Sequence, residues 1–178
     1  IALAASAVAF LLVPIRSLPA TEILRAEYVK GLQRYTNVPY FWGGENFTGI
    51  DCSGLIRRGL IDSLFMNGVK SANPSLVRNS LILWWNDCTA KELGKALPNL
   101  TTHILNTPSI NQLDHSTILP GDLAVTESGV HIMAYLGNQT WIEADPAEGR
   151  VIQVVVPSTD NPWFKQPMRI VRWSVLTP

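Results

Sequence analysis

The chain has 178 residues, of which 47% are hydrophobic and 16% are charged, and its formal net charge is zero. This composition predicts one folded domain with a substantial core and excludes a disordered chain. A neutral chain without long runs of like charge offers no electrostatic footprint for nucleic acid, so we expect no nucleic-acid partner.

The N-terminal stretch predicts the protein's location. Residues 1–13 carry no charge, but the run is shorter than the roughly 20 apolar residues that a membrane span needs. It is typical of a signal-peptide core or of the end of a spanning helix, with a buried core helix as the alternative. We therefore interpret residues 1–16 as a signal peptide or membrane anchor and residues 17–178 as one domain. The expectation is an exported protein, periplasmic or associated with the membrane through its N-terminus.

Two amphipathic helices are predicted in the first half of the chain. The first covers residues 21–36 and is capped by Thr21. The second covers residues 52–65, with Asp51 at its cap position and Gly68 as its stop signal.

The second predicted helix has an apolar face of leucines and isoleucines, and Arg57 and Arg58 fall mostly opposite to it. Gly54 lies inside this helix, where a glycine costs about 1 kcal/mol relative to alanine. Its presence predicts that another backbone or a substrate comes close.

The middle of the chain shows less regularity. Residues 74–87 are compatible with a helix and residues 90–97 with a short continuation, whereas the prolines and asparagines that follow predict loop. A long segment without clear periodicity is often a functional loop, so we interpret residues 71–115 as an insertion.

Strands dominate the last third. In residues 130–136, His131, Met133 and Tyr135 fall on one face of a predicted strand and Ile132, Ala134 and Leu136 on the other, and Gly137-Asn138 is a hairpin signal. The predicted strands cover residues 123–125, 130–136, 140–144, 151–156 and 169–175. Helices followed by an antiparallel meander predict an α+β domain with the helices packed on the sheet.

Cys52 is the candidate nucleophile. It lies at the predicted start of a helix, just after the glycine-rich turn at Gly43-Gly44. The helix dipole and the free N–H groups of the first turn favour a thiolate there. The same N–H groups can hold the oxyanion of an acyl-transfer intermediate. We expect the other cysteine, Cys88, to be a buried free thiol, with a disulfide to Cys52 as the alternative.

A thiolate needs a histidine partner, and the chain has three histidines. His131 lies in a predicted strand, His103 in a polar stretch, and His115 just before a turn. Because a strand positions a side chain more rigidly than a loop, we choose His131.

A third residue should accept the other N–H of the imidazole. In a hairpin centred on Gly137, His131 and Glu143 lie at equal distances from the turn and would be neighbours on one face. Asp145 lies on the same face, further along, and is the second candidate. The sequence contains no metal-binding motif such as C-x-x-C or H-E-x-x-H, so we expect no metal and no cofactor.

Five motifs resemble those of the NlpC/P60 cysteine peptidases, namely P-Y-F-W-G-G (39–44), D-C-S-G-L (51–55), L-P-G-D-L (119–123), V-H-I-M-A-Y-L-G-N (130–138) and W-I-E-A (141–144). The resemblance covers roughly residues 22–65 and 116–175, in the right order. It implies a papain-like α+β core. It also implies hydrolysis of amide bonds in peptidoglycan stem peptides, often next to D-glutamate.

The resemblance also assigns roles to residues. It implies that Cys52 is the nucleophile and His131 the base. It further implies that Tyr40, Asp51 and Ser53 line the substrate site, where an acidic group would suit a free amino end. We add Trp42, from the same motif, to the expected substrate contacts.

Two features depart from the family pattern. The third catalytic position is commonly His, Asn or Gln in the family, whereas this chain has Glu143. The spacing between Cys52 and His131 is also longer than in a compact member, and the excess falls in the insertion at residues 71–115.

The sequence therefore predicts an exported cysteine peptidase that acts on cell-wall peptides. Two alternatives stay open. One is a papain-like amidase or acyltransferase with another acyl substrate. The other is a module that binds cell-wall peptides or a partner protein without catalysis.

Overall fold

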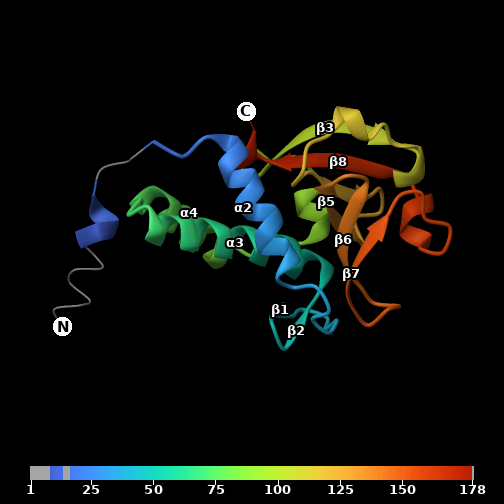
Figure 1. Ribbon diagram of the computed structural model, residues 1–178, viewed down its shortest axis with the longest axis horizontal. Helices are drawn as coiled ribbons and strands as arrows, with labels where there is room; N and C mark the ends of the chain where they lie inside the picture. Colours follow the sequence, from blue (N-terminus) through green and yellow to red (C-terminus); the bar gives the residue numbers. More distant parts are fainter. Residues whose placement is uncertain (1–8, 14–16, 178) are drawn as a thin grey trace.

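A computed structural model describes residues 9–13 and 17–177. Within these residues, six strands form one antiparallel sheet in the order β3-β8-β4-β5-β6-β7, and the helices lie along one side of it (Figure 1). The predicted α+β class is therefore confirmed. The predicted signal or anchor segment, residues 1–16, falls largely outside the described residues. None of the helices in the described part has the length and apolar character that a membrane crossing requires.

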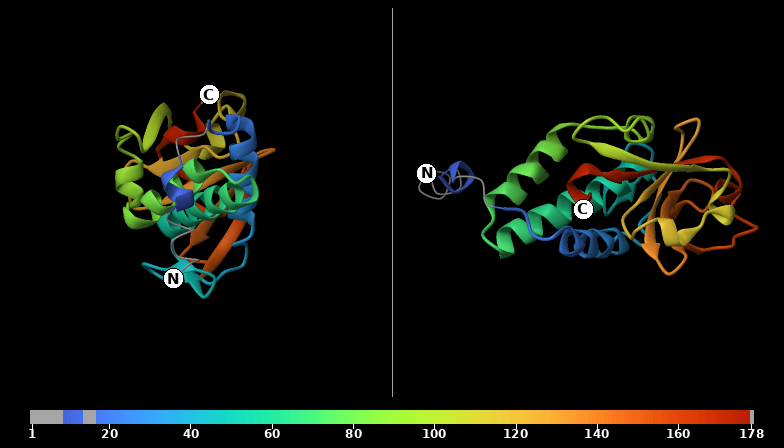
Figure 2. Two further views of the ribbon diagram at one scale, coloured as in Figure 1. Left: turned by 90° about the vertical axis from the view of Figure 1, so that its left-hand side faces the viewer. Right: turned by 90° about the horizontal axis from the view of Figure 1, so that it is seen from above.

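The helical layer consists of α2 (Thr21–Gln33), α3 (Cys52–Lys70), α4 (Pro74–Trp85) and the single turn α5 (Ala90–Leu93). Helices α3 and α4 form an antiparallel pair, and α2 packs across α3 (Figures 1 and 2). Their long axis leads from the sheet toward the N-terminal end of the described chain, as the view from above shows (Figure 2).

The N-cap of α2 lies one residue before the predicted cap. It is Ala20, whose carbonyl accepts the N–H groups of Ile23 and Leu24 and whose side chain forms no cap. The prediction that Thr21 caps this helix is therefore wrong, and Thr21 is the first helical residue. The helix ends at Gln33 rather than at residue 36, and Asn37 then takes a left-handed conformation with φ +68°.

Helix α3 begins at Cys52, as predicted, and its N-cap is Asp51. The prediction that Gly68 ends the helix is wrong, since α3 continues to Lys70. Gly68 instead allows α3 and α4 to pack closely, because a Cβ atom there would lie 2.6 Å from Cγ2 of Val77.

The main sheet contains β3 (Thr101–Thr107), β4 (Leu123–Thr126), β5 (Ile132–Gly137), β6 (Thr140–Asp145), β7 (Arg150–Val155) and β8 (Met168–Trp173). Five of these strands match the predicted ranges to within two residues. Strand β3 lies in the stretch predicted to be loop, so that prediction is wrong. It is an edge strand that pairs only with β8 and exposes much of its length, which explains its polar sequence.

The central strands of the main sheet are buried on both faces. Leu55, Ile56 and Leu60 of α3 belong to the core on one face, together with Ile132 and Ile142. On the other face, segments between strands contribute Ile110, Leu113, Ile118 and Phe164 to a core with Trp141 of β6 and Met168 of β8. This double burial holds the β5–β6 hairpin rigidly between the helices and the loop at residues 157–167.

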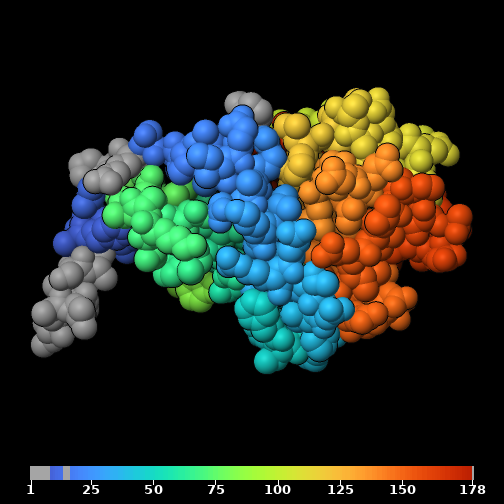
Figure 3. Space-filling model, viewed as in Figure 1, coloured from blue at the N-terminus to red at the C-terminus, as the bar shows by residue number. Residues whose placement is uncertain are grey.

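A short two-stranded hairpin, β1 (Glu45–Asn46) and β2 (Gly49–Ile50), precedes α3. It lies at the lower edge of the molecule in Figure 1 and is coloured cyan at the same edge of the space-filling view (Figure 3). The hairpin leads directly into Asp51 and Cys52, so it brings the chain back to the start of α3.

Candidate active site

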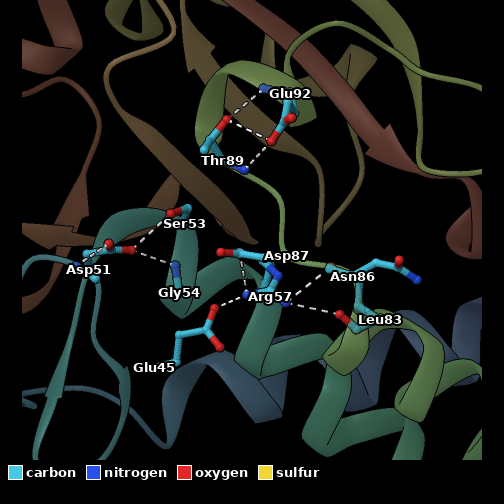
Figure 4. Close-up of polar contacts among 11 residues, drawn as sticks. Glu45, Asp51, Ser53, Gly54, Arg57, Leu83, Asn86, Asp87, Thr89 and Glu92 are labelled. Atoms are coloured by element: carbon cyan, nitrogen blue, oxygen red, sulfur yellow. Dashed lines mark hydrogen bonds and ion pairs between the residues drawn. The ribbon is translucent and has the colours of Figure 1, made fainter.

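Asp51 fixes the position of Cys52, the candidate nucleophile, at the start of α3. One of its carboxylate oxygens accepts the N–H of Gly54 at 2.7 Å and the hydroxyl of Ser53 at 3.0 Å (Figure 4). The other oxygen accepts the N–H of Gly43 at 2.8 Å. Asp51 therefore joins the glycine-rich turn to the first turn of the helix, with Cys52 between them and 8% exposed.

Gly54 is required by a close backbone contact. A Cβ atom at this position would lie 2.2 Å from the carbonyl oxygen of Gly44, which is closer than any real side chain comes. The prediction that another backbone approaches Gly54 is confirmed. Because of this contact, the glycine-rich turn packs directly on the first turn of α3.

His131 stands one residue before β5, not inside a strand as predicted. Its backbone is fixed by Thr126 at the end of β4, since the N–H of His131 donates to the Thr126 hydroxyl at 3.1 Å. The His131 carbonyl in turn accepts the N–H of Thr126 at 3.1 Å. Both residues are buried, so the β4–β5 connection sets the position of the imidazole.

Glu143 is the carboxylate partner of His131. Its Oε2 lies 2.5 Å from Nε2 of the imidazole, and the residue is fully buried on β6. The predicted hairpin register is wrong by two positions. An irregularity after Tyr135 shifts the pairing, so that Ala134 lies opposite Ile142 and Glu143 lies diagonal to His131 rather than opposite. Contact is still made because long side chains reach a diagonal neighbour on an antiparallel pair.

The charges around His131 favour the imidazolium. Burial is the largest single influence and lowers the pKa of His131, but the hydrogen bonds and negative charges of Cys52 and Glu143 outweigh it and raise the pKa to about 9. Since Glu143 occupies Nε2, Nδ1 is the ring nitrogen that remains for the Cys52 thiol. At neutral pH the site therefore holds a cation between two acidic groups.

Two residues at the site were missed from the sequence. Nδ2 of Asn161 donates to Oε1 of Glu143 at 2.5 Å. The Trp163 ring stacks on the His131 ring, with centroids 4.2 Å apart and planes 16° apart. Both come from the loop at residues 157–167, where the Asn161 side chain also caps the short helix η3 (Pro162–Lys165). An asparagine followed by a proline is a signal for such a turn, but it does not show that the turn folds onto His131.

The remaining candidates lie elsewhere. Asp145, the second candidate for the third position, accepts the N–H groups of Ala147 and Glu148 and so fixes the turn after β6. His103 lies on edge strand β3 and contacts Asn106. His115 accepts the indole N–H of Trp141 at 3.1 Å. The structure thus brings His131 and Glu143, not these residues, together with Cys52.

Cys88 is a buried free thiol, as expected, and Cys52 is free as well. Burial raises the pKa of Cys88 to about 11, so its thiol stays neutral at physiological pH. The alternative of a disulfide between the two cysteines is wrong.

A cleft of about 1300 Å³ opens beside Cys52. Trp42, Asp51 and Ser53, three of the four expected substrate contacts, line it. Tyr40, the fourth, is half-buried and is not among the lining residues; its pKa is raised by burial and then by the negative charges of Cys52, Asp51 and Asp145. The lining also includes Trp84 and the residues 87–90, which belong to the predicted insertion.

No group of three or more His, Cys, Asp or Glu side chains suited to a metal ion occurs among the described residues. Through its own side chains the site offers a thiol beside an imidazolium and a carboxylate.

Comparisons with known proteins agree on one family. The model of the NlpC/P60 family matches residues 37–172. The P60 domain of an antigen from M. avium subspecies paratuberculosis is similar in structure, with a TM-score of 0.52, 21% identity, and coverage of 89% of this chain and 98% of that one. The peptidoglycan hydrolase RipB from Mycobacterium tuberculosis is similar with a TM-score of 0.53, 19% identity, and coverage of 87% and 68%. NlpC2 from Trichomonas vaginalis is similar with a TM-score of 0.53, 18% identity, and coverage of 85% of this chain and 48% of that one. Among curated proteins, none matches the chain.

Proposed function

The chain belongs to the NlpC/P60 family, and on this basis we propose that it is a cysteine peptidase that hydrolyses amide bonds in peptidoglycan stem peptides. One observation carries the proposal: the only thiol at the start of a described helix lies beside an imidazole whose pKa is raised to about 9 and whose other nitrogen is held by a buried carboxylate. A structural cysteine has no need of such partners.

The reaction begins with the Cys52 thiolate beside the imidazolium of His131. The thiolate attacks the carbonyl carbon of the peptide, and the first-turn N–H groups of α3 stabilise the oxyanion. The imidazolium of His131 then gives its proton to the leaving amine, which leaves a thioester on Cys52. Water then attacks the thioester while His131 takes its proton as general base. The new carboxyl group is released, and the Cys52 thiolate and the His131 imidazolium are restored.

Glu143 orients the imidazole in both steps and stabilises its positive charge. The cleft residues Trp42 and Ser53 contact the substrate, and Tyr40 lies near Cys52 and Asp51. Asp51 has a structural role in addition, because both of its oxygens already hold the glycine-rich turn and the helix start. The apolar run at residues 1–13 supports a protein that works outside the cytoplasm, where such a substrate is found.

Trapping the covalent intermediate tests this function and separates it from the two alternatives. The protein is mixed with peptidoglycan fragments and quenched in acid within the first turnover. Its intact mass is then measured, followed by the masses of its peptides after digestion. We expect the intact mass to increase by that of a muropeptide acyl group, and the increase to be found on the peptide that contains Cys52. An adduct from lipid but not from muropeptide would favour another acyl substrate. No adduct from either would favour a binding module.

A further inference from the structure

Arg57 is a buried guanidinium on the helix of the nucleophile. It lies on α3, past Cys52, and is 1% exposed. The sequence pattern placed it on the polar face, but the structure encloses it between α3, α4 and the β1–β2 hairpin. Since a buried charge is costly unless it is paired, the partners of Arg57 show what it holds together.

The guanidinium has four acceptors, and they belong to two other segments of the chain (Figure 4). One nitrogen pairs with the carboxylate of Glu45 on β1 and, at 2.9 Å, with that of Asp87. The second donates to the carbonyl oxygens of Leu83 at 3.0 Å and Asn86 at 3.2 Å. Arg57 therefore joins the hairpin and the C-terminal end of α4 to the helix that carries Cys52.

Both segments line the substrate cleft. Glu45 and Trp42 belong to the hairpin and the turn before it, and Trp84 and Asp87 belong to the end of α4 and the residues that follow it. Both tryptophans are largely exposed, at 79% and 54%. Exposed tryptophans on a cleft offer large, rigid contact surfaces to a ligand. Their positions depend on the segments that Arg57 connects.

We propose that Arg57 is a positioning residue that assembles the substrate cleft, fixing the segment at residues 83–87 and the β1–β2 hairpin relative to Cys52. The inference rests on the proposed function and extends it. Residues 83–87 belong to the predicted insertion. Their contacts with Arg57 make this part of the insertion a wall of the substrate site. Arg57 sets substrate affinity without taking part in the reaction at Cys52.

Arginine suits this role because its planar fork presents five N–H donors. A lysine keeps the charge but has a single compact ammonium group, which cannot serve two carboxylates and two carbonyls in different segments at once. The conservative change Arg57→Lys therefore tests whether the geometry of the guanidinium is needed, because the positive charge is retained. Arg58 is the matched control, since it is the adjacent arginine and pairs at 2.8 Å with Asp62 on its own helix.

The test measures kcat and KM on a soluble muropeptide, together with the rate at which iodoacetamide alkylates Cys52. For Arg57→Lys we expect KM to rise about tenfold, while kcat and the alkylation rate stay within about twofold of wild type. Arg58→Met should leave all three values unchanged. An unchanged KM in Arg57→Lys would overturn the proposal. A fall in both kcat and the alkylation rate of Cys52, by the same factor relative to wild type, would overturn it as well.

A second variant covers the case in which Arg57→Lys does not fold. The Asp87 side chain is 87% exposed, so Asp87→Asn removes one of the four contacts without disturbing the core. We expect a rise in KM of about threefold at an unchanged melting temperature. No change in KM in this folded variant would count against the inference.

Hydrogen exchange provides a readout that needs no substrate. The amides of residues 83–87 and 43–46 should exchange faster in Asp87→Asn and Arg57→Lys than in wild type, and at the wild-type rate in Arg58→Met. Unchanged exchange in both test variants would overturn the positioning role, even if wild-type protein releases fragments from peptidoglycan. Faster exchange in a protein without hydrolytic activity would support the positioning role and contradict only the proposed function.

Discussion

Glu143 shows how single residues prepare the site. It is fully buried, and each of its carboxylate oxygens has a partner, His131 on one and Asn161 on the other. A buried carboxylate is tolerated only when it is paired and hydrogen-bonded. Glu143 can thus remain buried and still orient His131. A carboxylate with only one of its oxygens hydrogen-bonded would be less stable in this position.

The pH dependence follows from His131. Its pKa is raised from about 6.5 to about 9, so the imidazolium and the stability it contributes are fully present below pH about 6.5 and are lost as the pH rises through about 9. We expect kcat/KM to decline with rising pH near pH 9. Glu143→Gln removes one of the causes of the raised pKa of His131 and should move this alkaline decline to lower pH. A decline at the wild-type pH in Glu143→Gln would show that Glu143 does not control the pKa of His131.

Asn161 should matter for both stability and activity. Asn161→Ala leaves Oε1 of Glu143 buried without its 2.5 Å partner, which costs about 1–3 kcal/mol of unfolding free energy. We also expect kcat to fall, because Glu143 is then less firmly directed at His131. Urea denaturation and steady-state kinetics check the two effects. Asn106→Ala, at an exposed asparagine on edge strand β3, is the control and should change neither.

Among the elements, the crossing of α3 and α4 depends on Gly68. In an isolated helix, replacing glycine by alanine stabilises the helix by about 1 kcal/mol. Here the new Cβ atom would lie 2.6 Å from Cγ2 of Val77, so we expect Gly68→Ala to lower the melting temperature instead. The double variant Gly68→Ala/Val77→Ala removes that atom and should recover part of the loss. An increase in melting temperature in Gly68→Ala alone would contradict the packing argument.

The elements also show what the sequence could predict. The starts of α3 and of the central strands follow from caps and from apolar patterns that are local in the chain. Strand β3 was missed because an edge strand with polar, exposed side chains lacks that pattern. The contact of His131 with Glu143 was predicted because a tight hairpin connects them. Asn161, Trp163 and the burial of Arg57 were not, since these contacts depend on how distant segments pack.

At the scale of the whole molecule, the fold divides the work between two parts. Helix α3 carries Cys52, the proposed nucleophile, whereas Glu143 lies on β6 and His131 directly before β5, so the site forms only when the helical layer packs on the sheet. The segment between α4 and α5 contributes to the lining of the cleft. The shared fold with NlpC/P60 domains extends over most of the chain.

The central claim is that Cys52 cleaves peptide amide bonds in peptidoglycan. The most direct measurement is mass spectrometry of purified peptidoglycan after incubation with wild-type protein and with Cys52→Ala. The account predicts new fragments with free amino and carboxyl ends from wild type, and none from Cys52→Ala. Equal release by wild type and Cys52→Ala, or no release by wild type, would contradict it.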